Sequence, residues 1–304
     1  MYSFWTKTFG TTKASICYSR SSCYNSRLVS ARSVQDDEPL ELTGDWRSFR
    51  AKLIKSTAST TSEGKINQAN LRRLELDSPD LAAEGFWCHP TSRPEKGGLL
   101  VASLKVSELK GNDRLEEVVA VLIEHGDQGS IGLILNRPTS MVMGKRPNGM
   151  PLQLSVRTSY PKSMQIHNAP PEVQSVFADN RLYCGGFTAQ QVIHLLHGHP
   201  LPGAQEVVPG IFMGGELAAA KEVGEGRLRA EDFRFFAGAL VWDEGELDKE
   251  AEKGCWLPVA SSRALVLKQC LQLPTPLWVE VLQLLGGEYA QVAADADAEF
   301  EDDE

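Results

Sequence analysis

The sequence lacks the features by which most membrane proteins, metalloproteins and enzymes are recognised. No stretch approaches the ~18 consecutive apolar residues of a membrane-spanning helix, which predicts a soluble protein. No CxxC pair occurs, so we expect no zinc site. The sequence also lacks a nucleophile–base pair, paired carboxylates and a phosphate loop. It therefore indicates no catalytic residue and no cofactor, and it favours a binding protein over an enzyme.

Charge is distributed unevenly along the chain. A net charge of -9 argues against direct binding of nucleic acid, which requires a basic face to displace counterions. Residues 1–35 contain no Asp or Glu, but they are rich in serine and threonine and carry five lysines and arginines. This composition is typical of an organelle transit peptide, so we expect a chloroplast protein, with mitochondrial import as the alternative. The last ten residues hold seven acids and predict a disordered tail.

Four segments are expected: a transit peptide over 1–35, an extension over 36–95, a globular domain over 96–290 and an acidic tail over 291–304. In the extension, apolar residues recur at helical spacing and predict an amphipathic helix over 45–54. Residues 140–163 are expected to form a surface excursion, and 170–177 match no element. Strands are predicted at 99–103, 118–123, 131–135, 207–213 and 235–242, and helices at 216–223, 229–233, 247–253 and 276–285. Paired strands followed by late helices indicate an α+β fold with a largely antiparallel sheet.

The segment GSIGLILNRP, Gly129–Pro138, is the strongest candidate for a site. It predicts a turn, a buried strand and a stop at the proline, which cannot donate to a strand ladder. Arg137 would then present its guanidinium fork to a carboxylate or phosphate, and Asn136 would orient the ligand. In the structural alternative, Arg137 ties down loop carbonyls or an internal acid, and Asn136 makes a turn.

A second candidate lies where Cys184 precedes Gly185 and Gly186. A thiolate beside backbone amides in a tight turn would be nucleophilic or redox-sensitive. Alternatively, Cys184 is a small buried residue that precedes a turn, since the sequence supplies no base for it.

Histidines and tryptophans leave further alternatives open. On a helix, His194 and His197 would share a face, and His125 or Glu124 could be a third metal ligand. On a strand they would face opposite sides and be ordinary histidines. Trp242 and Trp256 either form an aromatic wall for a ligand or anchor the charged helix between them.

Four segments together resemble the YqgE/AlgH family. The first is the strand GGLLVAS, Gly97–Ser103. The second fits H-x-x-x-G-x-x-G-L-I/V-x-N-R-P at His125, Gly129, Gly132, Leu133, Asn136, Arg137 and Pro138. The third matches a GGP motif at Gly185 and Gly186, with Phe187 in place of the proline, and His197 matches the histidine that follows. The fourth agrees at Phe236, Gly238, Trp242, Leu247, Glu250 and Trp256, and departs at Ala239, Val241 and Glu246.

The resemblance covers residues 96–287 and implies an α+β fold with a bifurcated, partly barrel-like sheet surrounded by helices. The stretch DWRSFRAKL behind a transit-like leader resembles the plant and algal branch. The family has no established reaction, and some bacterial members are described as regulators of transcription or of exopolysaccharide synthesis.

These observations predict a non-enzymatic binding or regulatory protein whose partner is an anionic small molecule, a peptide or an unknown protein. The candidate ligand-binding residues are Asn136, Arg137, His125, Gly185, Gly186 and His197. One alternative is a thiol-dependent enzyme or hydrolase centred on Cys184. The other is a transcriptional regulator that depends on a partner.

Overall fold

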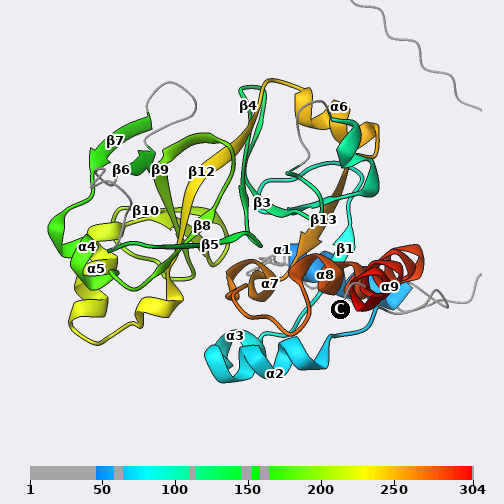
Figure 1. Cartoon of the computed structure of the whole chain (residues 1–304), viewed down its shortest axis with the longest axis horizontal. Coiled ribbons are helices and arrows are strands. Elements are labelled where there is room, and N and C mark those ends of the chain that lie inside the picture. Colours follow the sequence, from blue (N-terminus) through cyan, green and yellow to red (C-terminus); the bar gives the residue numbers. More distant parts are fainter. Residues whose placement is uncertain (1–45, 58–63, 110–113, 145–152, 158–163, 303–304) are drawn as a thin grey trace, which may run out of the picture. The chain divides into compact units, whose positions relative to one another are not determined.

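A computed structural model of the chain describes residues 46–57, 64–109, 114–144, 153–157 and 164–302 (Figure 1). The predicted transit peptide lies outside these residues and stays a prediction. Residues 43–304 form one compact unit. The described residues of the extension, from Trp46 on, belong to the same compact unit as the globular domain.

Nine α-helices and two short 3-10 helices occur in the described part of the chain. The α-helices are α1 (Trp46–Thr57), α2 (Gln68–Asp77), α3 (Pro79–Ala83), α4 (Pro171–Val176), α5 (Glu216–Gly224), α6 (Glu246–Glu252), α7 (Arg263–Leu267), α8 (Leu277–Leu285) and α9 (Gly287–Asp302). The 3-10 helices are η1 (Leu104–Glu108) and η3 (Ala230–Asp232). None of these helices has the length and apolar character needed to cross a membrane.

The strands of the described residues form one branched sheet, with the main path β1-β13-β2-β3-β4-β12-β9-β11-β10. They are β1 (Cys88–Pro90), β2 (Leu99–Ala102), β3 (Val119–Gly126), β4 (Gly129–Ile134), β5 (Pro138–Val142), β6 (Gln153–Arg157), β7 (Met164–Asn168), β8 (Arg181–Cys184), β9 (Thr188–His197), β10 (Ala204–Val208), β11 (Ile211–Gly214), β12 (Arg234–Trp242) and β13 (Trp256–Ser261). Most pairs are antiparallel, and the parallel ones are β12 with β8 and β6 with β9. The predicted α+β class is confirmed, and within the described residues the sheet does not close into a barrel.

The branch point is β12. Its C-terminal half pairs with β4, and its N-terminal half pairs with both β9 and β8. Between the halves, Gly238 has a φ of +71°, and a Cβ atom there would lie 2.7 Å from the carbonyl oxygen of Gly186. Glycine is required at this position because no other residue accepts both the left-handed backbone and the close approach.

Helices cover both faces of the sheet around β2 and β3. Leu99 and Val101 pack toward the cluster that contains α8, whereas Leu100 belongs to the opposite cluster with Leu247 of α6. Both faces are buried, which explains why these strands are continuous apolar runs. A third cluster joins α4 and α5 to β8, β9 and β12. Figure 1 shows α4 and α5 beside β5 and β8, with α8 and α9 at the far side.

Three predictions about elements are wrong. Residues 207–213 are a hairpin of β10 and β11, because Pro209 and Gly210, which has a φ of +77°, form a turn between them. Residues 170–177 contain α4, whose first residue is a proline, as the N1 position tolerates. The excursion predicted over 140–163 contains β6 and most of β5.

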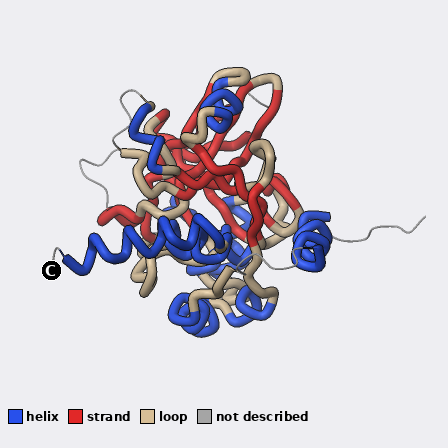
Figure 2. Tube along the Cα trace, turned by 90° about the vertical axis from the view of Figure 1, so that its right-hand side faces the viewer, coloured by secondary structure: helices blue, strands red, loops and turns tan. Residues whose placement is uncertain are grey.

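The acidic C-terminal segment is also helical rather than a disordered tail. Helix α9 runs to Asp302 and is the long helix that leads to the C-terminus in Figure 2. Its first half is anchored, since Ala293 is fully buried and Val292 packs against the core.

Candidate functional site

Asn136 and Arg137 connect β4 to β5, and their side chains bind the backbone of the chain. Asn136 Oδ1 accepts a hydrogen bond from the amide of Val119 (3.0 Å), and Asn136 Nδ2 donates to the carbonyl of Glu117 (2.8 Å). Glu117 has a φ of +54°, so Asn136 stabilises an uncommon backbone conformation. Arg137 Nη2 donates to the carbonyl of Glu116. The Arg137 contact is of the kind that the structural alternative predicts, whereas Asn136 bonds backbone groups 17 and 19 positions earlier rather than making a turn.

The structure brings Cys184–Gly186 next to Arg137. The amide of Cys184 donates to the carbonyl of Arg137 (2.8 Å). A Cβ atom would lie 2.4 Å from the nearest backbone atom of β12 at Gly185, and 2.0 Å at Gly186. Both glycines are explained by this close approach of two chain segments. Cys184 Sγ donates to the carbonyl of Gly186 (3.7 Å).

His125 lies far from these residues. It pairs with Ser130 at the turn of the β3–β4 hairpin, whereas Asn136 follows the other end of β4. Six residues of strand separate the two ends by roughly 20 Å. The ring of His125 bonds Ser130 Oγ (2.8 Å) and lies 3.7 Å from Asp248 of α6.

His197 is in the core. It belongs to β9, which confirms the strand alternative, so His194 and His197 face opposite sides of the sheet. The His197 side chain is fully buried, with Nε2 2.9 Å from the carbonyl of Gly214 and Nδ1 accepting from the amide of His199 (3.2 Å). Burial lowers the pKa of His197 to about 4. A neutral ring with both nitrogens bonded to backbone offers no atom to a ligand.

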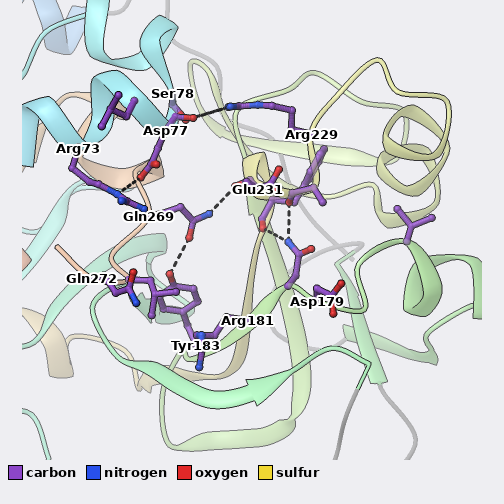
Figure 3. A pocket seen from close by; sticks show the side chains of 16 residues that line it. Arg73, Asp77, Ser78, Asp179, Arg181, Tyr183, Arg229, Glu231, Gln269 and Gln272 are labelled. Carbon is purple, nitrogen blue, oxygen red and sulfur yellow. Dashed lines mark hydrogen bonds and ion pairs between the residues drawn. The ribbon is translucent and has the colours of Figure 1, made fainter.

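A different set of residues lines a cavity of about 570 Å³ between α2, β8, η3 and the loop after α7 (Figure 3). We call it the arginine pocket, because three arginines from distant parts of the chain contribute to it. The lining residues are Arg73, Leu76, Asp77, Ser78, Val176, Asp179, Asn180, Arg181, Tyr183, Arg229, Ala230, Glu231, Phe233, Gln269, Leu271 and Gln272. None of the residues predicted as ligand-binding is among them.

Two of the arginines are paired within the wall. Arg73 Nε lies 2.8 Å from Asp77 Oδ2. Arg229 bonds Asp232 Oδ1 (2.6 Å), and it also reaches the carbonyl of Asp77 (2.8 Å) across the rim. Burial would raise the pKa of Asp232, but hydrogen bonds from His199 and Arg229 outweigh it and lower that pKa. Arg229 therefore links η3 to the end of α2 at the rim of the pocket.

Arg181 is paired differently. Its Nη1 donates to the carbonyl of Thr139 (2.7 Å). Across the described residues it forms no ion pair with a carboxylate, unlike Arg73 and Arg229. A guanidinium without a carboxylate is the group in this pocket best suited to an incoming anion.

Polar side chains at the bottom of the arginine pocket are joined by hydrogen bonds. Tyr183 donates from its hydroxyl to Gln269 Oε1 (2.9 Å), and Gln269 Nε2 donates to the carbonyl of Glu231 (2.7 Å). Burial raises the pKa of Tyr183 despite the nearby charge of Arg234. Gln272 has a φ of +56° at the same wall, and such outliers concentrate at functional sites.

Sequence reasoning missed this pocket because its arginines are separated by about 50 to 100 positions and share no motif. The strongest motif, around Asn136 and Arg137, instead marks a place where backbone segments meet. Glycines and a proline signal such turns, but they do not reveal cavities formed by separate elements.

Comparison with known proteins identifies the relatives. A model of the AlgH-like family matches residues 103–290. The chain is 28% identical over 203 residues to a UPF0301 protein of Chlorobium luteolum, covering 65% of this chain and 89% of that relative. It is 30% identical over 210 residues to a UPF0301 protein of Chlamydia trachomatis, covering 67% of this chain and 93% of that relative.

Two solved structures are similar over the same region. The solution structure of the AlgH protein from Pseudomonas aeruginosa is 19% identical, with a TM-score of 0.45, over 66% of this chain and 93% of that one. A crystal structure from Corynebacterium diphtheriae is 18% identical, with a TM-score of 0.46, over 67% and 93%. The family match spans more than half of the sequence, and this chain belongs to the AlgH-like family.

Proposed function

We propose that this protein is a non-enzymatic binding module that holds a small carboxylate-bearing ligand, such as the free end of a peptide, in the arginine pocket. The observation that carries the proposal is the convergence of Arg73, Arg181 and Arg229 on one cavity, with Arg181 lacking a carboxylate partner in the described part of the chain. A carboxylate that meets Arg181 gains charge-assisted hydrogen bonds of the bidentate kind.

The acids of the rim restrict the ligand. Asp179 and Glu231 are exposed and line the same cavity, so a purely anionic ligand would meet both attraction and repulsion. A ligand that carries an amine or amide beside its carboxylate matches both signs of charge. Peptides and amino acids have this chemistry, which is why we prefer them to phosphate esters.

The lining also supports binding over catalysis. Of its side chains, only Ser78 and Tyr183 carry a hydroxyl, and there is no histidine, lysine or cysteine among these described residues. Among the described residues, neither hydroxyl is hydrogen-bonded to a carboxylate or an imidazole: Ser78 Oγ accepts from Arg229 (3.3 Å), and Tyr183 donates to an amide oxygen. Nucleophilic catalysis needs a base within hydrogen-bond reach.

Thermal shift with a dipeptide library and the matched C-terminal amides tests the proposal on the full chain. We expect dipeptides with a free carboxylate to raise the melting temperature and their amides not to do so. Arg181→Gln should lose at least ten-fold in affinity, because one charge-assisted pair contributes about 1.5–3 kcal/mol. Arg93→Gln, an exposed arginine outside the pocket, is the matched control. Unchanged melting with every dipeptide, or equal shifts in Arg181→Gln, would refute the proposal.

A further inference from the structure

Arg234 of β12 is a buried cation with no carboxylate partner among the described residues. Its side chain is 1% exposed. Nη1 donates to the carbonyl of Val266 (3.0 Å), and Nη2 donates to the carbonyl of Leu135 (2.7 Å) and to Cys270 Sγ (3.6 Å). Nε has no hydrogen-bond partner. A charge held this way is costly, so a negative group in contact with it would be stabilised.

Aromatic rings enclose the guanidinium of Arg234. Its central carbon lies 4.5 Å from the ring centre of Tyr183 and 5.0 Å from that of Phe236. Among the described residues, the ionisable side chains that contact it are those of Tyr183 and Cys270. Tyr183 keeps its proton, since burial raises its pKa and its hydroxyl donates to Gln269. The sulfur of Cys270 is therefore the group that can supply the missing negative charge.

We propose that Cys270 is a modification site for peroxide, at which the buried guanidinium of Arg234 pairs with the thiolate. The thiol first loses its proton to solvent. The thiolate sulfur then attacks one oxygen of hydrogen peroxide, so that an S–O bond forms as the O–O bond breaks. Hydroxide leaves and takes a proton from solvent, which oxidises the sulfur to a sulfenic acid and reduces the peroxide to water. Cys270 is partly exposed, so a small oxidant reaches it.

Cys270 Sγ donates to the carbonyl of Lys268 (3.7 Å), as Cys184 Sγ does to the carbonyl of Gly186 (3.7 Å), so this contact does not distinguish the two thiols. The difference is the guanidinium of Arg234 at the sulfur of Cys270; among the described residues, Cys184 Sγ accepts no hydrogen bond from an arginine or lysine. Cys88 Sγ bonds the carbonyl of Val281. Burial raises the pKa of Cys255, and the charge of Glu250 adds to the effect. These three thiols serve as internal controls within the same molecule. The contacts therefore favour Cys270 as the reactive thiol, whereas the sequence predicts Cys184.

The modification has a structural consequence, because Cys270 lies between two residues of the arginine pocket. Gln269 and Leu271 both line that cavity, and Gln269 holds the hydroxyl of Tyr183. An added oxygen on Cys270 would displace this wall. The proposal does not depend on the ligand of the pocket.

The test uses the full chain, hydrogen peroxide, and dimedone as a trap for sulfenic acid, read by peptide mass spectrometry. We expect Cys270 to be trapped at least ten-fold faster than Cys184 and Cys88. The charged or titratable groups that face its sulfur are Arg234 and Tyr183, while the adjacent Lys268 pairs with Glu280.

Variants identify the cause of the reactivity. Arg234→Lys keeps a positive charge and should retain most of the excess rate, whereas Arg234→Gln should lose it. Cys184→Ser is the matched control and should leave the rate at Cys270 unchanged. The comparison within the wild-type protein needs no variant to fold. If Cys270 reacts no faster than Cys184 there, or if folded Arg234→Gln keeps the excess, the proposal fails.

Discussion

At the scale of single residues, Glu250 shows how one polar atom can organise an apolar region. Its Oε2 accepts hydrogen bonds from Trp242 Nε1 (2.9 Å) and Trp256 Nε1 (2.8 Å). The two indole rings meet edge to face, with centroids 5.9 Å apart. Both tryptophans are buried, so they anchor α6 to the sheet, as the structural alternative for this pair predicts.

Replacing this acceptor should destabilise the fold. Glu250→Ala leaves two buried indole N–H groups without a partner, and each costs about 1–3 kcal/mol. Glu250→Gln keeps one oxygen acceptor and should lose less than half as much. Urea unfolding followed by tryptophan fluorescence measures both effects. Glu252→Ala on the same helix is the control, because Glu252 is exposed. Equal stabilities of Glu250→Ala and Glu252→Ala would contradict the anchoring role.

Residue chemistry also marks the limit of sequence reasoning at the candidate site. The sequence is compatible with ligand binding by Asn136 and Arg137 and with bonding to the backbone. Only the positions of the carbonyls of Glu116 and Glu117 distinguish these two alternatives. Those carbonyls lie about 20 positions earlier in the chain. A donor identifies its own chemistry, but its acceptor is chosen by tertiary structure.

At the scale of elements, α1 is amphipathic as predicted, yet its orientation is reversed. Trp46, Phe49 and Leu53 share one face and are each more than 50% exposed. Arg47 is 4% exposed and donates to the carbonyls of Gly97 (2.9 Å) and Ser261 (3.1 Å). On the same inward side, Arg50 forms a two-bonded ion pair with Glu95. Helical periodicity reveals two faces, but it does not show which one meets the core.

Hydrogen exchange in residues 46–57 tests this orientation. In Arg47→Ala we expect roughly 5- to 150-fold faster exchange, because two backbone carbonyls lose a charged donor with a cost of about 1–3 kcal/mol. Alanine has a higher helix propensity than arginine, so the substitution does not destabilise the helix itself. Faster exchange in Arg47→Ala would therefore mean that α1 is bound less firmly to the rest of the domain. Phe49→Ser should stay within about two-fold of wild type, since an exposed side chain contributes about 0.5 kcal/mol or less. Similar acceleration in both variants would show that the apolar face is the docked one.

Helix α2 is held to the domain by a buried polar cluster. Asn70 Nδ2 donates to Glu280 Oε2 of α8 (2.6 Å), and Lys268 forms an ion pair with the same oxygen. Both charged side chains are about 1% exposed. The partners come from 68–77, 268 and 277–285, so this part of the extension packs on the globular domain. Buried pairs of this kind favour one arrangement over others more than they add stability.

At the scale of the whole molecule, the order of the predicted strands and helices was enough to predict the α+β fold class. It was not enough to predict that the sheet is branched. Adjacent strands such as β3 and β4 are joined by a tight turn, and apolar runs with glycines reveal them. The β12 strand pairs with three others that are distant in sequence. Its division depends on the left-handed Gly238, which the sequence shows only as a glycine in an apolar run. Only the resemblance to the YqgE/AlgH family predicted a branched sheet, because local sequence patterns do not show which distant strands pair.

Acid stability is a property of the whole fold that depends on His197. Its pKa is lowered to about 4 by burial, while an unfolded chain has the ordinary value of 6.5. Between these values the unfolded state binds a proton that the folded state does not. The stability associated with neutral His197 is therefore complete above pH 6.5 and is lost as the pH falls toward 4. The loss is at most about 1.4 kcal/mol per pH unit.

The variant His197→Gln isolates this contribution. Glutamine keeps a donor and an acceptor but does not titrate. The free energy of unfolding of His197→Gln should therefore decline less than that of the wild type between pH 6.5 and pH 4.5. Urea unfolding at half-unit pH steps measures the difference between the two proteins. Burial raises the pKa of Glu216, which acts in the opposite direction, but Glu216 is present in both proteins and its effect cancels. Parallel pH curves for wild type and His197→Gln would mean that the His197 ring takes up its proton as readily in the folded protein as in the unfolded chain.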